Sequence, residues 1–225
     1  MKPILTAEKA VETIGDGASL MVAGFMGCGN AFTLIQALLA KGSKSLTLIT
    51  SDTAFPQVGV GRLVTEGRVK KLITTHIGTN PNAGRMMNAG EIDVTLVPQG
   101  TFNERIRAKG AGLGGVLTPT GIGTAVEEGK QKLTIEGREY LLELPLGGDF
   151  AFIKAEVCDK YGNSFLPMAT KTAAVSMAMA ASRVIVEAER IVEPGEMDPE
   201  KVTIPGLFVS AIVQAVLPAS NLQQK

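Results

Sequence analysis

The stretch DGASLMVAGFMGCGN, residues 16–30, carries the first clear signature of the fold. The apolar run 20–23 predicts a buried strand, and glycines at positions 24, 27 and 29 follow it directly. Because glycine has no Cβ, the backbone there can adopt positive φ and leave its amide N–H groups accessible, as an anionic or acyl ligand at a strand end requires. The loop from Gly24 to Asn30 is therefore the first candidate site.

The pattern of this strand and loop is repeated through the first half of the chain. Apolar runs rich in β-branched residues occur at 20–23, 46–50, 72–75 and 92–97. Predicted helices separate or follow them at 31–40, 58–65, 81–88 and 102–108, with glycines at 42, 67, 90 and 110 as C-terminal stops. This alternation predicts an α/β fold with an open, mostly parallel sheet flanked by helices.

The second half of the chain has a different pattern. Residues 110–124, GAGLGGVLTPTGIGT, are rich in glycine and predict a long loop near a site or a junction between lobes. The runs 132–135 and 138–142 flank Glu136-Gly137 as in a β-hairpin. A strand at 150–157, a small-residue helix at 173–181, a strand at 184–187 and an acidic solvated loop at 187–200 follow. We expect one domain, residues 1–225, with mixed or antiparallel strands here and a small lobe or hairpin around 110–145.

Composition narrows the class of protein. Among 225 residues, 45% are hydrophobic, which is enough for one sizeable core. Lys plus Arg and Asp plus Glu are balanced at 22 each, so a nucleic-acid or anionic-membrane partner is not expected. No apolar run reaches the roughly 20 residues that span a bilayer, and Lys2, Glu8 and Lys9 stand where a signal peptide would be apolar. We expect a cytoplasmic protein.

Cysteines and metal-ligand patterns add little chemistry. Cys28 and Cys158 are the only cysteines, too few for a disulfide framework, and we expect two reduced thiols. No H-x-x-x-H or C-x-x-C pattern occurs, so no metal site is predicted. The methionines at 168, 177 and 179 lie among small residues and are expected to fill the core.

A dinucleotide site is one reading of the glycine loop. The spacing is G-x-x-G-x-G rather than G-x-G-x-x-G, although Asp52 follows the next predicted strand, where a ribose-binding acid would lie. The spacing therefore supports a nicotinamide-dependent dehydrogenase only weakly. A tight strand-to-helix turn that binds nothing is the other reading from these residues alone.

Two polar side chains at predicted strand ends are candidates for chemistry. His76 is the only histidine and follows the strand 72–75, yet it has no identifiable partner, so a hydrogen-bonded structural role is favoured over acid/base catalysis. Gln99 follows the strand 92–97, and its amide can donate to an oxygen that develops negative charge. A turn-stabilising glutamine is the equal alternative. No G-x-S-x-G elbow supports a serine triad.

Several motifs taken together resemble family I coenzyme A transferases, in their α (A) subunit of the acetate/acetoacetate or 3-oxoacid type. They are GFMGCG at 24–29, SDTA at 51–54, VPQGT at 97–101, ERIR at 104–107, and AG with TPTGIGT at 111–112 and 118–124. The resemblance covers nearly the whole chain in order. It implies an open α/β subunit that pairs with a β subunit, usually as α2β2, and moves CoA from an acyl-CoA to a free carboxylate.

The resemblance also implies which residues act. The nucleophile of the family is a glutamate of the β subunit, in a Ser-Glu-Asn-Gly motif that this chain lacks. Gln99 matches the glutamine that helps to form the oxyanion hole. No cofactor is implied beyond the CoA thioester, which is a substrate. The residues expected to contact substrate or CoA are Gly24, Phe25, Met26, Gly27, Cys28, Gly29, Asn30, Ser51 and Gly100.

The chain departs from the family pattern at three places. Ala23 replaces a glycine and Ala31 a proline of the GGF-x-x-x-G-x-P signature, and Thr172-Ala173-Ala174-Val175 stands where Asn-Phe-Asn-Pro is common. These departures leave room for a relative with altered chemistry, such as an acyl-CoA decarboxylase or hydrolase. A ligand-sensing α/β module that is not an enzyme is a further alternative, although no basic patch supports a regulator that binds DNA.

Overall fold

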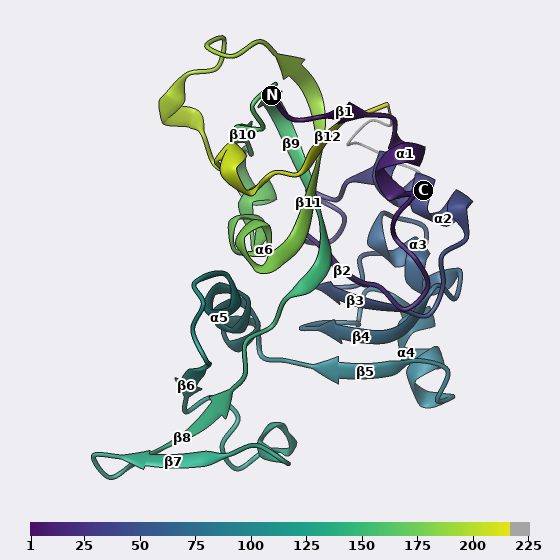
Figure 1. Cartoon of the computed structure of the whole chain (residues 1–225). Coiled ribbons are helices and arrows are strands. Elements are labelled where there is room, and N and C mark those ends of the chain that lie inside the picture. The colour runs from purple at the N-terminus through teal and green to yellow at the C-terminus, as the bar shows by residue number, and fades with distance from the viewer. Residues whose placement is uncertain (217–225) are drawn as a thin grey trace.

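The computed structural model describes residues 1–216 and contains a nine-stranded sheet of order β1-β12-β11-β9-β2-β3-β4-β5, with β10 paired to β9 (Figure 1). Every pairing along this path is parallel, and β10 runs antiparallel to β9. The predicted open, mostly parallel α/β sheet is confirmed. Its strands are β1 (Ile4–Leu5), β2 (Ser19–Val22), β3 (Leu46–Thr50), β4 (Val69–Thr74), β5 (Asp93–Leu96), β9 (Gly148–Asp159), β10 (Ser164–Phe165), β11 (Ala181–Val192) and β12 (Ala211–Gln214).

Helices follow the strands of the first half as predicted. They are α1 (Ala7–Val11), α2 (Phe32–Lys41), α3 (Val60–Thr65), α4 (Pro81–Asn88), α5 (Gln99–Gly110) and α6 (Ala174–Ala180), with 3₁₀ turns η1 (Ala125–Glu127), η2 (Met168–Lys171), η3 (Pro199–Lys201) and η4 (Gly206–Phe208). Gly42 ends α2 in the left-handed conformation, φ 86°, as a C-terminal glycine should. Among residues 1–216, no helix is long and apolar enough to cross a membrane.

The predicted boundaries of α5 were wrong at both ends. The helix begins at Gln99, because Pro98 precedes it as the N-cap with φ −53°, close to the helical value. It continues through Gly110 instead of stopping before it. A Cβ on Gly110 would lie 2.6 Å from Cβ of Met179, so this glycine allows α5 to pack closely against α6.

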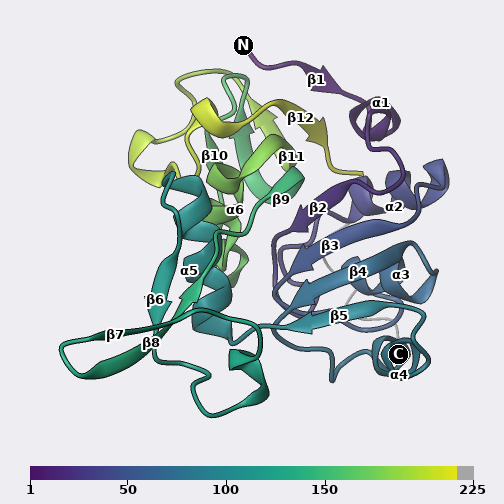
Figure 2. The ribbon, with the colours of Figure 1, turned by 60° about the horizontal axis from the view of Figure 1, so that its bottom comes forward.

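The core consists of two apolar clusters, one on each face of the sheet. Residues such as Leu34, Leu38 and Leu63 from α2 and α3 form the first cluster with one side of the strands. Phe102 and Met177, from α5 and α6, belong to the second cluster. Figure 2 shows α5 and α6 on the opposite side of the sheet from α2 and α3. Both faces are therefore covered, as a parallel sheet requires.

The long strands β9 and β11 extend beyond the predicted strands at 150–157 and 184–187. Residues 187–192, which we expected to begin a solvated loop, instead continue β11 beside β9, with Arg190 opposite Val157 in the ladder. The acidic composition of this segment suggested a loop. Backbone pairing to β9 decides the structure instead, because edge and face contacts override local propensity in a sheet.

A separate three-stranded sheet of order β6-β8-β7 lies beside α5 (Figure 1). Its strands are β6 (Val116–Thr118), β7 (Lys132–Ile135) and β8 (Arg138–Glu143), and both pairings are antiparallel. The expected hairpin is present, and its turn residues Glu136 and Gly137 have φ of 51° and 77°, as in a type I′ turn. The glycine-rich stretch 110–124 is not a loop throughout, because β6 pairs with β8 within it.

Candidate active site

The glycine loop, residues 24–30, is a tight hairpin that follows β2. The N–H of Phe25 donates to the carbonyl of Cys28 and the N–H of Cys28 donates to the carbonyl of Phe25, both at 2.9 Å. The two residues between them, Met26 and Gly27, have φ of 51° and 86°, as in a type I′ turn. A methionine in this conformation is uncommon. The loop therefore depends on restraints from elsewhere in the fold.

Asp52, directly after Ser51 at the end of β3, supplies one of these restraints. Its Oδ2 accepts from the N–H of Met26 at 2.8 Å, and its Oδ1 accepts from the N–H of Ala54 at 2.6 Å. Burial raises the pKa of the Asp52 carboxyl, and the two N–H donors and the nearby His76 oppose that rise. Because Asp52 is 2% exposed and both of its oxygens already accept from this chain's own backbone, it is poorly placed to bind a ribose, which argues against a dinucleotide site.

Asn30 provides the second restraint on the glycine loop. Its Nδ2 donates to the carbonyl of Ala23 and its Oδ1 accepts from the N–H of Val60, both at 2.9 Å. The side chain is so closely surrounded that a Cβ on Gly24 or Gly59 would lie 2.5 Å or 2.1 Å from its amide atoms. Asn30 is 2% exposed, so it positions the loop, and its contact with a substrate stays a prediction.

Gln99 is the first residue of α5 and is exposed at the end of β5. Its carboxamide oxygen lies 2.7 Å from Oγ1 of Thr75, and that hydroxyl lies 2.6 Å from the carbonyl of Ser51. A hydroxyl has one proton, and amide orientation is assigned from such contacts. Either Thr75 donates to the carboxamide oxygen, which leaves both amide N–H groups free, or the amide nitrogen faces Thr75 and keeps one free N–H. In both cases Gln99 can donate to a ligand.

Thr75 was not among the sequence candidates. It is the first residue after β4 and connects Ser51 to Gln99 across neighbouring strands. Its place directly before His76, at a predicted strand end, was the only available signal. A threonine at such a position is usually an ordinary strand residue, so the sequence alone did not distinguish it.

His76 lies beside Asp52, and the two residues form a parallel backbone bridge. Within residues 1–216 the imidazole has no hydrogen-bond partner, so the expected hydrogen-bonded structural role stays a prediction. A Cβ on Gly78 would lie 2.8 Å from Cε1 of His76, which shows that the ring packs on that backbone. The ring is a neighbour of the site rather than part of a hydrogen-bonded pair.

The two cysteines are free, as expected. Burial raises the pKa of the Cys158 thiol to about 11, so this sulfur stays protonated near neutral pH and is a poor nucleophile. Cys28 is part of the glycine loop and is half-buried. Across residues 1–216, no group of three or more His, Cys, Asp and Glu side chains is arranged to hold a metal ion.

The N-terminus of α2, which the glycine loop leads into, is occupied by a carboxylate of this chain. Oε2 of Glu187, on β11, accepts from the N–H of Leu34 at 3.0 Å, and Oε1 lies 3.2 Å from Nζ of Lys154. Burial raises the pKa of Glu187, although its contacts with Lys154 and the helix oppose this. Glu187 caps a helix whose N-cap, Ala31, has no capping side chain. The helix end is therefore not a phosphate cradle.

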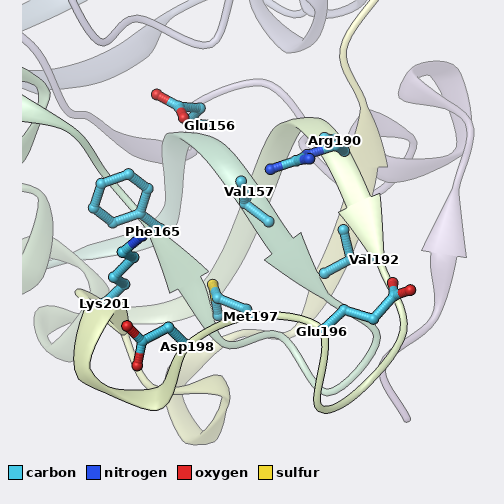
Figure 3. A pocket seen from close by; sticks show the side chains of 9 residues that line it. All are labelled: Glu156, Val157, Phe165, Arg190, Val192, Glu196, Met197, Asp198 and Lys201. Carbon is cyan, nitrogen blue, oxygen red and sulfur yellow. The ribbon is translucent and has the colours of Figure 1, made fainter.

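The predicted site residues thus gather at one edge of the sheet. The glycine loop, Ser51, Thr75 and Gln99 follow β2, β3, β4 and β5, which are parallel neighbours, so their carboxyl ends meet. A cavity of about 370 Å³ lies elsewhere, between the carboxyl-terminal parts of β9 and β11 and the loop that follows β11 (Figure 3). Carboxylates of Glu196 and Asp198 in its wall accept from backbone N–H groups of that same loop, and no predicted site residue lines it.

Two relatives match this chain over almost the full length of both sequences. The chain is 49% identical over 210 residues to the α subunit of acetate CoA-transferase from Escherichia coli K12, covering 93% of this chain and 96% of that subunit. It is 48% identical over 199 residues to the α subunit of acetoacetyl-CoA:acetate/butyrate CoA transferase from Clostridium acetobutylicum, covering 88% and 91%.

Solved structures share the fold. A thioester complex of an acyl-CoA transferase from E. coli O157:H7 with CoA superposes with a TM-score of 0.86 at 27% identity, and the match covers 95% of this chain and 47% of that one. This chain thus spans about half of that enzyme. A cysteine variant of the decarboxylase AibA/AibB gives a TM-score of 0.80 at 27% identity, covering 96% and 84%. Residues 4–215 match the sequence profile described as Coenzyme A transferase, and the chain therefore belongs to this family.

Proposed function

We propose that this chain is the α subunit of a heteromeric CoA-transferase that moves CoA between a short-chain acyl-CoA or 3-oxoacyl-CoA and a free carboxylic acid. The observation that carries this proposal is the full-length match to relatives named as α subunits of acetate and acetoacetyl-CoA transferases. The chain also lacks a Ser-Glu-Asn-Gly sequence. Its Glu-Gly pairs at 66–67, 128–129 and 136–137 follow helices or form the hairpin turn, away from the strand ends β2 to β5.

A glutamate of a β subunit supplies the nucleophile in this proposal. Its carboxylate oxygen attacks the thioester carbonyl carbon, the C–S bond breaks, and CoA leaves as the thiolate. The thiolate then attacks the glutamyl carbonyl of the acyl-glutamyl anhydride, which releases the first carboxylate and leaves a glutamyl-CoA thioester. A second acid takes CoA by the same steps in reverse. The steps need no cofactor in this proposal, because the glutamate, the thioester and the acceptor acid supply every bond that forms and every group that leaves.

Gln99 stabilises the oxygen that becomes negative when the thioester carbonyl is attacked. A free amide N–H at the start of α5 suits this role, since Thr75 holds the carboxamide and the helix N-terminus adds positive potential. In this proposal the glycine loop, Ser51 and Gly100, which follow strands of the same sheet edge as Gln99, contact the thioester. Phe25, which pairs with Cys28 at the base of the turn, is 45% exposed, and in this proposal it contacts substrate or the β subunit.

The assembly we propose is α2β2, with the site completed at the α–β junction. The test is co-expression with the partner chain, addition of acetoacetyl-CoA, and trapping with borohydride or hydroxylamine. We expect CoA transfer to acetate and a trapped glutamyl thioester on the partner. A complex that hydrolyses acyl-CoA without transfer, or that carries the adduct on neither chain, would show that this mechanism is wrong.

An acyl-CoA decarboxylase subunit is a second candidate. The likeness to the decarboxylase AibA/AibB, at the same 27% identity as the acyl-CoA transferase, favours it. The departure at Thr172-Ala173-Ala174-Val175 is compatible with altered chemistry. Release of CO₂ from a carboxylated acyl-CoA, together with a partner chain that lacks the glutamate, would support this candidate over transfer.

A further inference from the structure

A cleft lies between α5 and β6 and starts at the residue after Gln99. We call it the α5–β6 cleft. Its volume is about 600 Å³, and it is lined by Gly100, Thr101, Asn103, Glu104, Arg107, Val116, Leu117, Thr118 and Thr120. Figures 1 and 2 both place β6 alongside α5. A cleft of this size is much larger than an acetate or acetoacetate group needs, and its volume falls in the range of small-molecule sites.

Two polar atoms of the cleft residues have no hydrogen-bond partner in the described part of the chain. They are Oγ1 of Thr101 and Oδ1 of Asn103, and both atoms are buried. Thr101 as a whole is only 5% exposed. Nearly all buried polar atoms in native proteins are hydrogen-bonded, so these two groups require a partner that residues 1–216 do not supply.

Among the described residues that line the cleft, no charged side chain is unpaired. The Nε and Nη2 atoms of Arg107 lie 2.8 Å and 2.5 Å from Oε2 of Glu104, so the two charged side chains of the lining neutralise each other. Val116 and Leu117 add apolar surface on the side of β6. A phosphate or a nucleotide would meet a carboxylate here without a free cation, so a neutral ligand fits the cleft better.

The unpartnered atoms indicate the chemistry of that ligand. The carboxamide of Asn103 has an acceptor oxygen and a donor nitrogen, and no contact within residues 1–216 fixes which of the two faces the cleft. A ligand with both N–H and C=O groups can pair with it in either orientation, whereas a carboxylate, which has no donor, can pair in only one. The hydroxyl of Thr101 both donates and accepts, and because Oγ1 is buried, a ligand in the cleft would meet it only after rotation about χ1. An uncharged linear ligand with amide N–H and C=O groups between aliphatic carbons could bond to Thr101 and Asn103 and also pack on the apolar side of the cleft.

We propose that the α5–β6 cleft binds the pantetheine arm of the CoA substrate, with Thr101 and Asn103 bonded to its amides and Val116 and Leu117 packed on its aliphatic part. This inference rests on the proposed function. If Gln99 meets the thioester oxygen, a cleft that begins at Gly100 takes the part of CoA attached to the sulfur. The arm contains two secondary amides and a gem-dimethyl group and carries no charge before its phosphate.

The test compares three thioesters of one acyl group in the reconstituted complex: the CoA ester, the pantetheine ester and the S-methyl ester, which lacks the arm. The variants are Thr101→Val and Asn103→Leu, with Thr134→Val on the exposed face of β7 as the matched control. We expect kcat/KM for the CoA and pantetheine esters to fall about tenfold, the effect of one lost hydrogen bond. The value for the S-methyl ester should change less than twofold.

If the S-methyl ester reacts too slowly to give kcat/KM, binding of free pantetheine provides a second measurement. Calorimetric titration of the complex with free pantetheine should give a dissociation constant about tenfold higher in Thr101→Val, with an unchanged Tm because valine has the same shape. Equal losses for all three esters, or an unchanged pantetheine affinity, would overturn the proposal. An inactive wild-type complex that still binds pantetheine would contradict the proposed function and leave the cleft assignment standing.

Discussion

The glycine loop and the α5–β6 cleft lie at the same end of the sheet, but they differ in whether their polar side-chain atoms have hydrogen-bond partners. In the loop, both oxygens of Asp52 and both amide groups of Asn30 are bonded to backbone within the fold. In the cleft, Thr101 and Asn103 each have a buried polar atom that finds no partner within residues 1–216. The loop therefore contributes shape, whereas the helix side offers groups to a ligand.

This difference separates two kinds of mutational effect. Changes around the glycine loop should reduce the free energy of unfolding, because they break contacts that hold a strained hairpin. Changes at the start of α5 should leave folding intact and reduce catalysis or binding, because Gln99 is exposed and makes one side-chain bond. Each prediction below tests one side of this comparison.

Gly59→Ala should have the largest effect, on stability. A Cβ at this position would lie 2.1 Å from Oδ1 of Asn30, and φ is +48°. Overpacking and strained backbone together should lower the free energy of unfolding by about 3 kcal/mol. Urea denaturation measures this. Gly67→Ala is the control, since its φ is +66° but nothing lies within 4 Å, and equal losses in both would assign the effect to φ alone.

Gln99→Ala should leave stability unchanged and reduce kcat in the reconstituted complex by about 10²- to 10³-fold, roughly 3 kcal/mol of transition-state stabilisation. Steady-state transfer from acetoacetyl-CoA to acetate measures it. Gln131→Ala, an exposed glutamine before β7, is the matched control and should keep full activity. A Gln99→Ala complex with normal kcat would remove Gln99 from the mechanism and leave only a turn-stabilising role.

The regular part of the fold could be predicted from sequence because each local signal agreed with the final packing. The run 46–50 coincides with β3, and Gly42 ends α2 where a C-terminal glycine was expected. Prediction was wrong where tertiary contacts override a local signal. Gly110 is inside α5 because α6 packs against it, and residues 188–192 stay in β11 because β9 pairs with this part of the strand.

For the site, sequence could indicate which residues stand at strand ends but could not assign their partners. Asp52 was considered as a ribose acid, and only the structure shows that it binds Met26 and Ala54. Thr75 was missed because its importance comes from a contact 24 residues away in the chain. Long-range hydrogen bonds leave no periodic pattern, so the sequence could indicate that these residues follow strands but not which groups they contact.

Thr75→Val should have a smaller effect than loss of Gln99 itself. Without the hydroxyl, the carboxamide loses its anchor but keeps its donors, so kcat should fall about tenfold with little change in KM. Thr75→Ser should restore most of the activity, because it returns the hydroxyl without the methyl group. If serine and valine were equally impaired, packing of the methyl group rather than orientation of Gln99 would explain the result.

The smallest predicted effect is the pH dependence of the free energy of unfolding that Asp52, beside the glycine loop, contributes. Because burial raises the pKa of Asp52 above its ordinary value of 3.8, the folded state favours the neutral carboxyl. Its stabilising contribution is complete below 3.8 and is lost as pH rises through the folded pKa. The unfolding free energy of the wild type minus that of Asp52→Asn should therefore fall as pH rises from about 3.8 through the folded pKa of Asp52.

Urea denaturation of both proteins across the acidic range measures that difference. Glu187 also has a raised pKa, but it titrates in both proteins, so its contribution cancels. A difference that instead grew with pH would mean that the N–H groups of Met26 and Ala54 outweigh burial and select the carboxylate. Asp52 would then act as a charged anchor of the glycine loop, and the loop side would no longer be electrically neutral like the cleft opposite it.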